Sequence, residues 1–124
     1  MPDTVNSEDS QPIDFSTVLE RIDGDASFLQ DLLNLYFQEF ADKKHLLEKA
    51  LAGGDSTQIQ EVGHSLKGAS ANLSLAPLQR LALAIEKAGR EKDLEKARQA
   101  IGALGTEFLR LKAFLEGHPL EDLA

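Results

Sequence analysis

Three residues of one short segment, His64, Lys67 and Gly68, have the types and spacing for group-transfer chemistry. A neutral imidazole is a nucleophile, and an unperturbed histidine side chain, with a pKa of about 6.5, is mostly neutral near pH 7. A lysine three residues further along a helix lies one turn away, where its cation favours the neutral ring and can pair with a charged group attached to it. A glycine four residues along leaves space beside the ring. The spacing therefore indicates a nucleophilic imidazole that another protein can approach.

This chemistry requires a helix that turns His64 away from the core, and segment 58–75 has that pattern. Each residue of a helix turns by about 100°, which gathers the apolar side chains of this segment into one stripe. The stripe consists of Ile59, Val62, Leu66, Ala69 and Leu73. His64 falls on the opposite side, where its neighbours are Gln60, Lys67, Gly68 and Ala71. We expect Gln60, Glu61 and Ala71 to contact a docking partner.

The residues HSLKG at 64–68, followed by ASANLSL, resemble the signature of histidine-containing phosphotransfer (HPt) domains. The similarity covers roughly residues 13–116 and includes IDGDASFLQDLLNLYFQEF and ALAGGDSTQIQEVGHSLKG. It implies that His64 is the phosphorylated residue, through its Nε2 atom. It also implies that the partners are receiver domains of response regulators and of hybrid histidine kinases. Where the family often has a glycine at the end of this helix, this sequence has Ser74.

The same resemblance implies where the rest of the chemistry resides. Receiver domains supply the acceptor aspartate, the Mg²⁺ and most of the catalysis, so we expect no cofactor and no metal on this chain. The chain itself would supply a positioned nucleophile and a docking surface. It would not be an enzyme, because no Gly-rich phosphate loop for ATP is present and Gly53-Gly54 ends a helix instead.

The remaining sequence predicts an all-α fold. Prolines occur only at positions 2, 12, 77 and 119, and Leu, Ala, Glu, Lys and Gln dominate, which favours helix over strand. Apolar periodicity and helix-ending glycines predict a short helix over 14–22, a long helix that starts at about Asp25 or Ser27 and ends at Ala52, and further helices over about 56–73, 77–88 and 93–116. Short connections make sequential helices antiparallel. We therefore expect an up-down-up-down four-helix bundle with a short additional N-terminal helix.

Helix-start and helix-end signals also predict the boundaries of the domain and of its helices. Residues 1–12 are predicted to be a disordered leader, 13–117 the bundle and 118–124 a C-terminal tail. Ser27 with Gln30, and Asp55 with Gln58, have the spacing of capping boxes. Gly89 and the charged run Arg90–Asp93 are predicted to form a turn, and the wider run Glu86–Glu95 is interpreted as a charged turn. Further side chains assigned to the core include Phe28, Leu35 and Leu83.

Composition excludes several classes of function. The net charge of −8 argues against nucleic acid and anionic membranes as main partners. Without cysteine there is no disulfide, and no apolar run approaches the roughly 18 residues of a membrane span. The acidic, polar start does not resemble a signal peptide, so we expect a cytoplasmic protein. A monomer is the default expectation, because the sequence leaves the oligomeric state open. His45 and His118 are predicted to be surface residues, and the three histidines lack metal-ligand spacing.

Other interpretations remain open at this point. The main alternative is a non-catalytic helical module that binds and sequesters a response-regulator receiver domain. A structural bundle with a fortuitous motif is a third possibility, and it would bind no receiver. Gly68 could also be a glycine that packs against a neighbouring helix rather than one that provides clearance.

Overall fold

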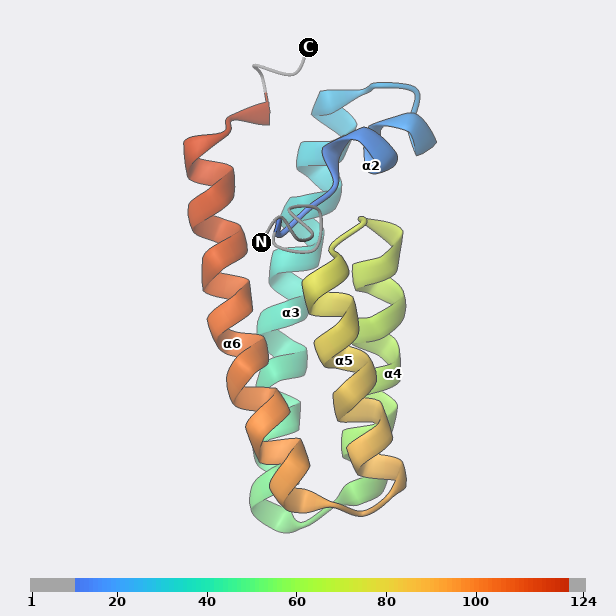
Figure 1. The fold of residues 1–124 in the computed structure, drawn as a ribbon, viewed down its shortest axis with the longest axis vertical. Helices are drawn as coiled ribbons and strands as arrows, with labels where there is room; N and C mark the ends of the chain where they lie inside the picture. The colour runs from blue at the N-terminus through green and yellow to red at the C-terminus, as the bar shows by residue number, and fades with distance from the viewer. Residues whose placement is uncertain (1–10, 121–124) are drawn as a thin grey trace, which may run out of the picture.

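The computed structural model describes residues 11–120, which form five helices joined by short turns (Figure 1). The helices are α2 (Phe15–Arg21), α3 (Ala26–Gly53), α4 (Ser56–Asn72), α5 (Ala76–Arg90) and α6 (Leu94–Gly117). Within 11–120 there is no strand, so the all-α prediction is confirmed. Residues 1–10, most of the predicted leader, and 121–124, in the predicted tail, lie outside the described residues.

An aspartate begins four of these helices, and its carboxylate accepts a hydrogen bond from the backbone N–H three residues later. The four are Asp14, Asp25, Asp55 and Asp93. Such caps satisfy N–H groups that the first turn of a helix leaves unpaired. Asp55 caps α4 as predicted, with Gln58 N–H as its donor. The predicted cap at Ser27 is wrong, because Asp25 already occupies that position two residues earlier.

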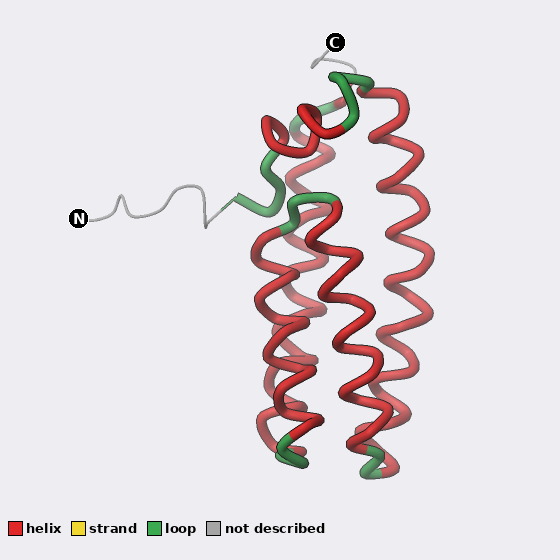
Figure 2. Tube along the Cα trace, turned by 90° about the vertical axis from the view of Figure 1, so that its right-hand side faces the viewer, coloured by secondary structure: helices red, strands yellow, loops and turns green. Residues whose placement is uncertain are grey.

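Helices α3 to α6 alternate in direction and form the expected antiparallel four-helix bundle (Figures 1 and 2). The 28-residue α3 and the 24-residue α6 extend beyond the turn between α4 and α5, and α2 lies at that end. Arg21 of α2 donates hydrogen bonds to the carbonyl oxygens of Ala71 and Asn72, at 3.0 and 3.1 Å. The short N-terminal helix is thus joined to the end of α4.

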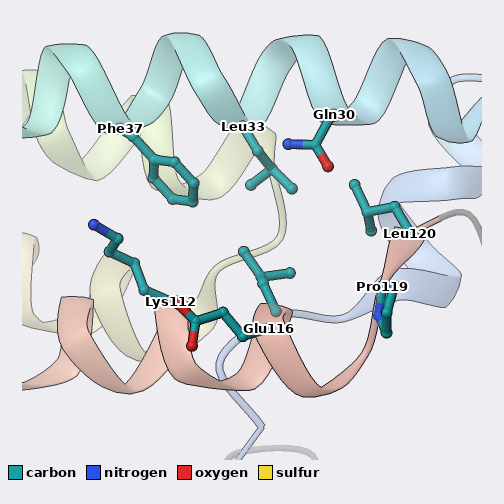
Figure 3. A pocket seen from close by; sticks show the side chains of 8 residues that line it. Gln30, Leu33, Phe37, Lys112, Glu116, Pro119 and Leu120 are labelled. Carbon is teal, nitrogen blue, oxygen red and sulfur yellow. The ribbon is translucent and has the colours of Figure 1, made fainter.

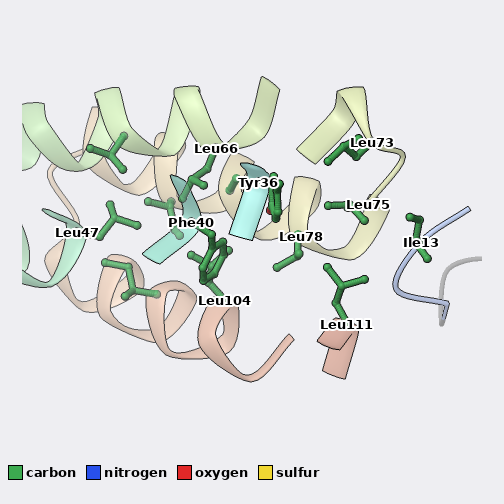
Figure 4. Close-up of a cluster of buried hydrophobic side chains, with 14 of the residues drawn as sticks. Ile13, Tyr36, Phe40, Leu47, Leu66, Leu73, Leu75, Leu78, Leu104 and Leu111 are labelled. Carbon is green, nitrogen blue, oxygen red and sulfur yellow. The ribbon is translucent and has the colours of Figure 1, made fainter. Parts of the chain in front are cut away.

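The core runs along the axis of the bundle and is lined mainly by leucine (Figure 4). It continues beyond the helices, because Ile13 is fully buried and Leu120 is 8% exposed. The predicted apolar stripes are wider than the covered faces, since each helix of a small bundle leaves one side in solvent. Phe28, Leu35 and Leu83 are consequently exposed, at 46%, 55% and 48%, and their assignment to the core is wrong.

Helix α5 also runs further than the sequence indicated. It continues through Gly89 to Arg90, so Glu86 lies inside a helix rather than at a charged turn. Glycine at position 89 is required by packing, since a Cβ there would lie 2.5 Å from the backbone nitrogen of Gln60 on α4. A glycine that permits close approach of two helices has the same appearance in sequence as one that ends a helix.

The turn between α4 and α5 contains a strained residue. Ser74 has a φ of 57°, in the left-handed region, and its buried hydroxyl has no hydrogen-bond partner within residues 11–120. Left-handed backbone costs a non-glycine residue about 1–2 kcal/mol, and an unpaired buried hydroxyl adds to the cost. We expect Ser74→Gly to raise the free energy of unfolding by about 1 kcal/mol, measured by urea denaturation.

Lys92 provides a matched control for this substitution. It has a φ of 59° in the turn between α5 and α6, but its side chain is exposed. Lys92→Gly relieves backbone strain only, so its gain should be smaller than that of Ser74→Gly. A loss of stability in Ser74→Gly would contradict the assignment of strain to this turn.

Candidate functional site

His64 lies on the outer face of α4, where the helical pattern placed it. Its side chain is 69% exposed, whereas Ile59, Val62 and Leu66 on the opposite side of the helix are buried. The ring Nδ1 lies 2.9 Å from Oε2 of Glu86, which projects from the neighbouring helix α5. One nitrogen of the ring is therefore held by the protein, and the ring as a whole is open to solvent.

Glu86 is the centre of the charged cluster at this site. Its side chain is only 8% exposed, and the Lys67 ammonium lies 2.7 Å from its Oε1. The Arg90 guanidinium, one turn along α5, lies 3.5 Å from Oε2. The hydrogen bond with Lys67 is the main cause that holds the pKa of the Glu86 carboxyl below its ordinary value, against burial, which raises it. Glu86 is therefore an anion at neutral pH.

The sign of this shift determines its effect on folding. A carboxyl whose pKa is lower in the folded state than in the unfolded state stabilises the fold above the unfolded value. The ordinary value for Glu86 is 4.5, so its contribution is present at neutral pH and is lost as the pH falls through and below that value. Acidification should therefore loosen the pairing of Glu86 with Lys67 and His64.

The contact with Glu86 decides which ring nitrogen can react. A carboxylate is only an acceptor, so Nδ1 must carry the proton of the hydrogen bond. In the neutral ring Nε2 then keeps a free lone pair. Nε2 is therefore the ring nitrogen whose lone pair is available for nucleophilic attack, in a ring that a buried partner holds at Nδ1.

Two glycines allow α4 and α5 to approach closely enough for this contact. A Cβ at Gly63, next to His64, would lie 2.6 Å from the backbone nitrogen of Glu86. A Cβ at Gly89 would meet the backbone of Gln60 in the same way, at 2.5 Å. Real Cβ contacts are not this short, so larger residues would push the helices apart. The local pattern of α4 does not indicate that Gly63 faces α5, because that contact depends on how the two helices are placed.

Gly68 has the opposite environment. It is exposed, and a Cβ built there would meet nothing within 4 Å. The alternative that Gly68 packs against a neighbouring helix is therefore wrong. Open space lies on the His64 side of α4, one turn beyond the histidine.

A hollow of about 440 Å³ lies beside the ring. It is lined by Thr57, Gln60, Glu61, His64 and Glu86. Two of the residues expected to contact a partner, Gln60 and Glu61, thus line the same hollow as His64. Ala71 does not line it; it is half-buried near the end of α4, where its carbonyl accepts the hydrogen bond from Arg21.

Other hollows lie away from His64. One, of about 240 Å³ between α3 and α4, is bordered by the exposed Leu35 and by Leu73. Another, of about 510 Å³ between α3 and α6, is lined by residues that include Leu33, Phe37 and Lys112 (Figure 3). Sequence periodicity assigned Leu35 to the core and did not indicate these surfaces.

The other histidines have no comparable surroundings. His45 is exposed, and the ring of His118 stacks on Phe114 while its Nδ1 lies 2.9 Å from the Phe114 carbonyl oxygen. No group of three His, Cys, Asp or Glu side chains that could hold a metal ion occurs in the described part of the chain. None of its helices is both long and apolar enough to cross a membrane.

Comparison with known proteins places this chain in a family. The family model for the Hpt domain matches residues 31–115, which include His64 and Glu86. The chain belongs to the Hpt domain family. Hpt domains are phosphocarriers rather than kinases, so histidine phosphotransfer in a phosphorelay is the general function. The resemblance stated from HSLKG is thereby confirmed.

A solved structure shows the same fold. The crystal structure of histidine-containing phosphotransfer protein B (HptB) from Pseudomonas aeruginosa PAO1 matches with a TM-score of 0.78 and 21% sequence identity. The match covers 86% of this chain and 92% of that one. A search of curated proteins finds no match. The arrangement of helices in this Hpt domain is therefore shared with a solved phosphotransfer protein.

Proposed function

We propose that this Hpt domain carries a phosphoryl group on Nε2 of His64 between aspartates of receiver domains in two-component signalling. The observation that carries this proposal is the hydrogen bond from Nδ1 to Glu86, which leaves Nε2 as the nucleophile on a ring that is 69% exposed. Neither His45 nor His118 has a carboxylate partner of this kind among the described contacts.

The transfer step needs little from this chain besides the positioned ring. The Nε2 lone pair forms a bond to phosphorus while the bond from phosphorus to the donor aspartate oxygen breaks, and the aspartate leaves with the electron pair. The ring keeps its Nδ1 proton, which Glu86 holds. An ammonium group has three N–H donors, so Lys67 can remain paired with Glu86 and also reach a phosphoryl oxygen.

The partner completes the reaction in this proposal. Receiver domains of response regulators and of hybrid histidine kinases supply the aspartate and the Mg²⁺, and this monomeric, cytoplasmic chain needs no cofactor of its own. Gln60 and Glu61 border the hollow beside His64 and are the proposed docking contacts, together with Ala71. Glu86, the carboxylate that contacts the ring, is already paired with His64, Lys67 and Arg90 and is not free to activate a water molecule, so phosphorylated His64 should hydrolyse slowly.

The proposal is tested by incubating the chain with purified phosphorylated receivers and Mg²⁺ and following its intact mass at neutral pH. We expect the mass gain of one phosphoryl group, removed by acid and stable to alkali. Binding to a phosphorylated receiver without any mass gain would instead favour a module that sequesters the receiver. Neither binding nor transfer with any receiver of the source organism would indicate a purely structural bundle.

Clearance at Gly68 gives a second expected result. Gly68→Gln places a long side chain where a receiver must approach, without a clash inside the domain. We expect the transfer rate to fall on the order of tenfold or more, which corresponds to at least about 1.4 kcal/mol of lost docking free energy. The rate is measured with a phosphorylated receiver, and circular dichroism monitors the fold.

Gly102→Gln is the matched control for this substitution. Gly102 is exposed on α6, and a Cβ there also meets nothing within 4 Å. Its variant should transfer at the native rate. Equal rates for Gly68→Gln and the native chain would show that receivers do not approach over Gly68.

A further inference from the structure

We propose that Glu86 keeps the Nδ1 proton on the ring after His64 is phosphorylated, so that the phosphorylated ring remains a cation at neutral and mildly alkaline pH. A cationic ring can leave phosphorus as neutral imidazole when the phosphoryl group is passed on. The inference rests on the proposed phosphorylation of His64 at Nε2. It assigns to Glu86 the role of a positioning residue that acts after the first transfer, on how readily the phosphoryl group can be passed on.

Whether Nδ1 keeps its proton determines how readily the ring leaves phosphorus in the onward transfer. Once Nε2 has formed its bond to phosphorus, a ring that still carries the Nδ1 proton is a cation. In the onward step the bond between Nε2 and phosphorus breaks, and its electron pair returns to Nε2, which gives a neutral imidazole. If the Nδ1 proton had been lost to water, the leaving group would be an imidazolate anion, which is a much stronger base and leaves less readily.

The geometry places an acceptor where that proton is. Oε2 of Glu86 lies 2.9 Å from Nδ1, and the Glu86 side chain is only 8% exposed, so water competes weakly for this contact. A carboxylate cannot donate, so a deprotonated Nδ1 would leave two lone pairs facing each other. An opposite charge this close stabilises the cationic form of the ring. The contact therefore favours the protonated phosphorylated ring.

The surrounding charges work in opposite directions. On α5, Glu86 stabilises a cationic ring and Arg90, 3.5 Å from Oε2, opposes it. On α4, Lys67 opposes it by sharing the Glu86 carboxylate at 2.7 Å, and the exposed Glu61 borders the same hollow. Lys67 also keeps Glu86 ionised, so the acceptor persists at neutral pH. The balance between Glu86 and Lys67 thus sets the pH at which the phosphorylated ring loses its proton.

The experiment labels the protein with ¹⁵N-histidine and phosphorylates it with phosphoramidate, a small phosphodonor that needs no receiver. The ¹⁵N chemical shifts of the His64 ring then report the protonation of Nδ1 between pH 5 and pH 10. In Glu86→Gln we expect the titration midpoint to fall by about 1 pH unit, the lower end of the effect of a nearby opposite charge, because Lys67 and Arg90 share the Glu86 carboxylate. Glutamine has the same shape, and its amide can donate to a deprotonated Nδ1.

Two further variants separate this role from a structural one. Lys67→Met removes the competing cation, so the midpoint should rise, opposite to the effect of Glu86→Gln. Glu91→Gln removes an exposed carboxylate just after α5 and should leave the midpoint unchanged. Onward transfer to an unphosphorylated receiver at pH 8.5 should slow in Glu86→Gln and recover toward pH 6. Circular dichroism monitors folding throughout.

The possible results distinguish a failure of this inference from a failure of the proposed function. A phosphorylated ring at His64 whose midpoint is the same in the native chain and in Glu86→Gln would overturn the inference alone. Shifts of the same sign in Glu86→Gln and Lys67→Met would also overturn it, because a general loosening of the site would explain them. Absence of phosphoryl on His64 in the native chain, with phosphoramidate and with receivers, would overturn the proposed function and this inference together.

Discussion

His64→Gln should abolish transfer of the phosphoryl group from a phosphorylated receiver while leaving the fold intact. Glutamine has no lone pair on a ring nitrogen and forms no phosphoramidate under these conditions, so the loss should be complete within detection. The side chain is 69% exposed, and Glu86 keeps its ion pairs with Lys67 and Arg90, so stability should change by no more than about 0.5 kcal/mol. Intact mass and far-UV circular dichroism measure the two outcomes.

His45→Gln and His118→Gln are the controls for this result. Both residues are exposed on other elements, in the middle of α3 and at the end of α6, and neither ring contacts a buried carboxylate. Both variants should be phosphorylated at the native rate. Undiminished labelling of His64→Gln would assign the phosphoryl group to another residue.

Gly63→Ala and Gly68→Ala should change stability in opposite directions although they lie five residues apart on one helix. Alanine is favoured over glycine in a helix interior by about 1 kcal/mol. At Gly68 the added methyl group meets open space, so Gly68→Ala should gain about that amount. At Gly63 it would lie 2.6 Å from the backbone nitrogen of Glu86, so Gly63→Ala should lose about 2 kcal/mol through overpacking.

The packing of α4 against α5 at Gly63 should also affect the rate of phosphoryl transfer. A methyl group at Gly63 forces α4 and α5 apart and lengthens the contact from Nδ1 to Glu86, so Gly63→Ala should also transfer more slowly. Urea denaturation gives the stabilities, and the receiver assay gives the rates. Equal stabilities for the two variants would contradict the close approach of α4 and α5 at Gly63.

The exposed face of α4 could be predicted from sequence because it depends only on local periodicity. A repeat of three and four residues in Ile59, Val62 and Leu66 fixes the buried side of the helix, and His64 must then lie opposite. The aspartate caps are similarly local, since each bonds within three residues of itself. These features need no knowledge of which helices are neighbours.

Glu86 could not be found in this way. It contacts His64 across 22 residues of sequence, and its own segment, with Gly89 and several charges, has the composition of a turn. Its burial depends on how closely α4 and α5 approach, which Gly63 and Gly89 determine through contacts between helices. A signal was present in the pair of glycines, one on each helix, but helix-to-helix register is needed to interpret it.

The assignment of Leu35 to the core is wrong for a related reason. Leu35 continues the repeat of α3, yet it is 55% exposed, because none of the helices within residues 11–120 covers that side of the bundle. Periodicity defines which side chains share a face and not whether a neighbour covers it. Leu35 instead borders the hollow between α3 and α4.

In the proposed transfer, one ring nitrogen, Nε2 of His64, carries the phosphoryl group. The most direct test is a ¹H–¹⁵N correlation spectrum of the ¹⁵N-histidine-labelled chain after phosphorylation by a receiver, with ³¹P coupling used to identify the bonded nitrogen. We expect coupling to phosphorus at Nε2 of His64 and at no other histidine nitrogen. Coupling at Nδ1 of His64, or on His45 or His118, would contradict it.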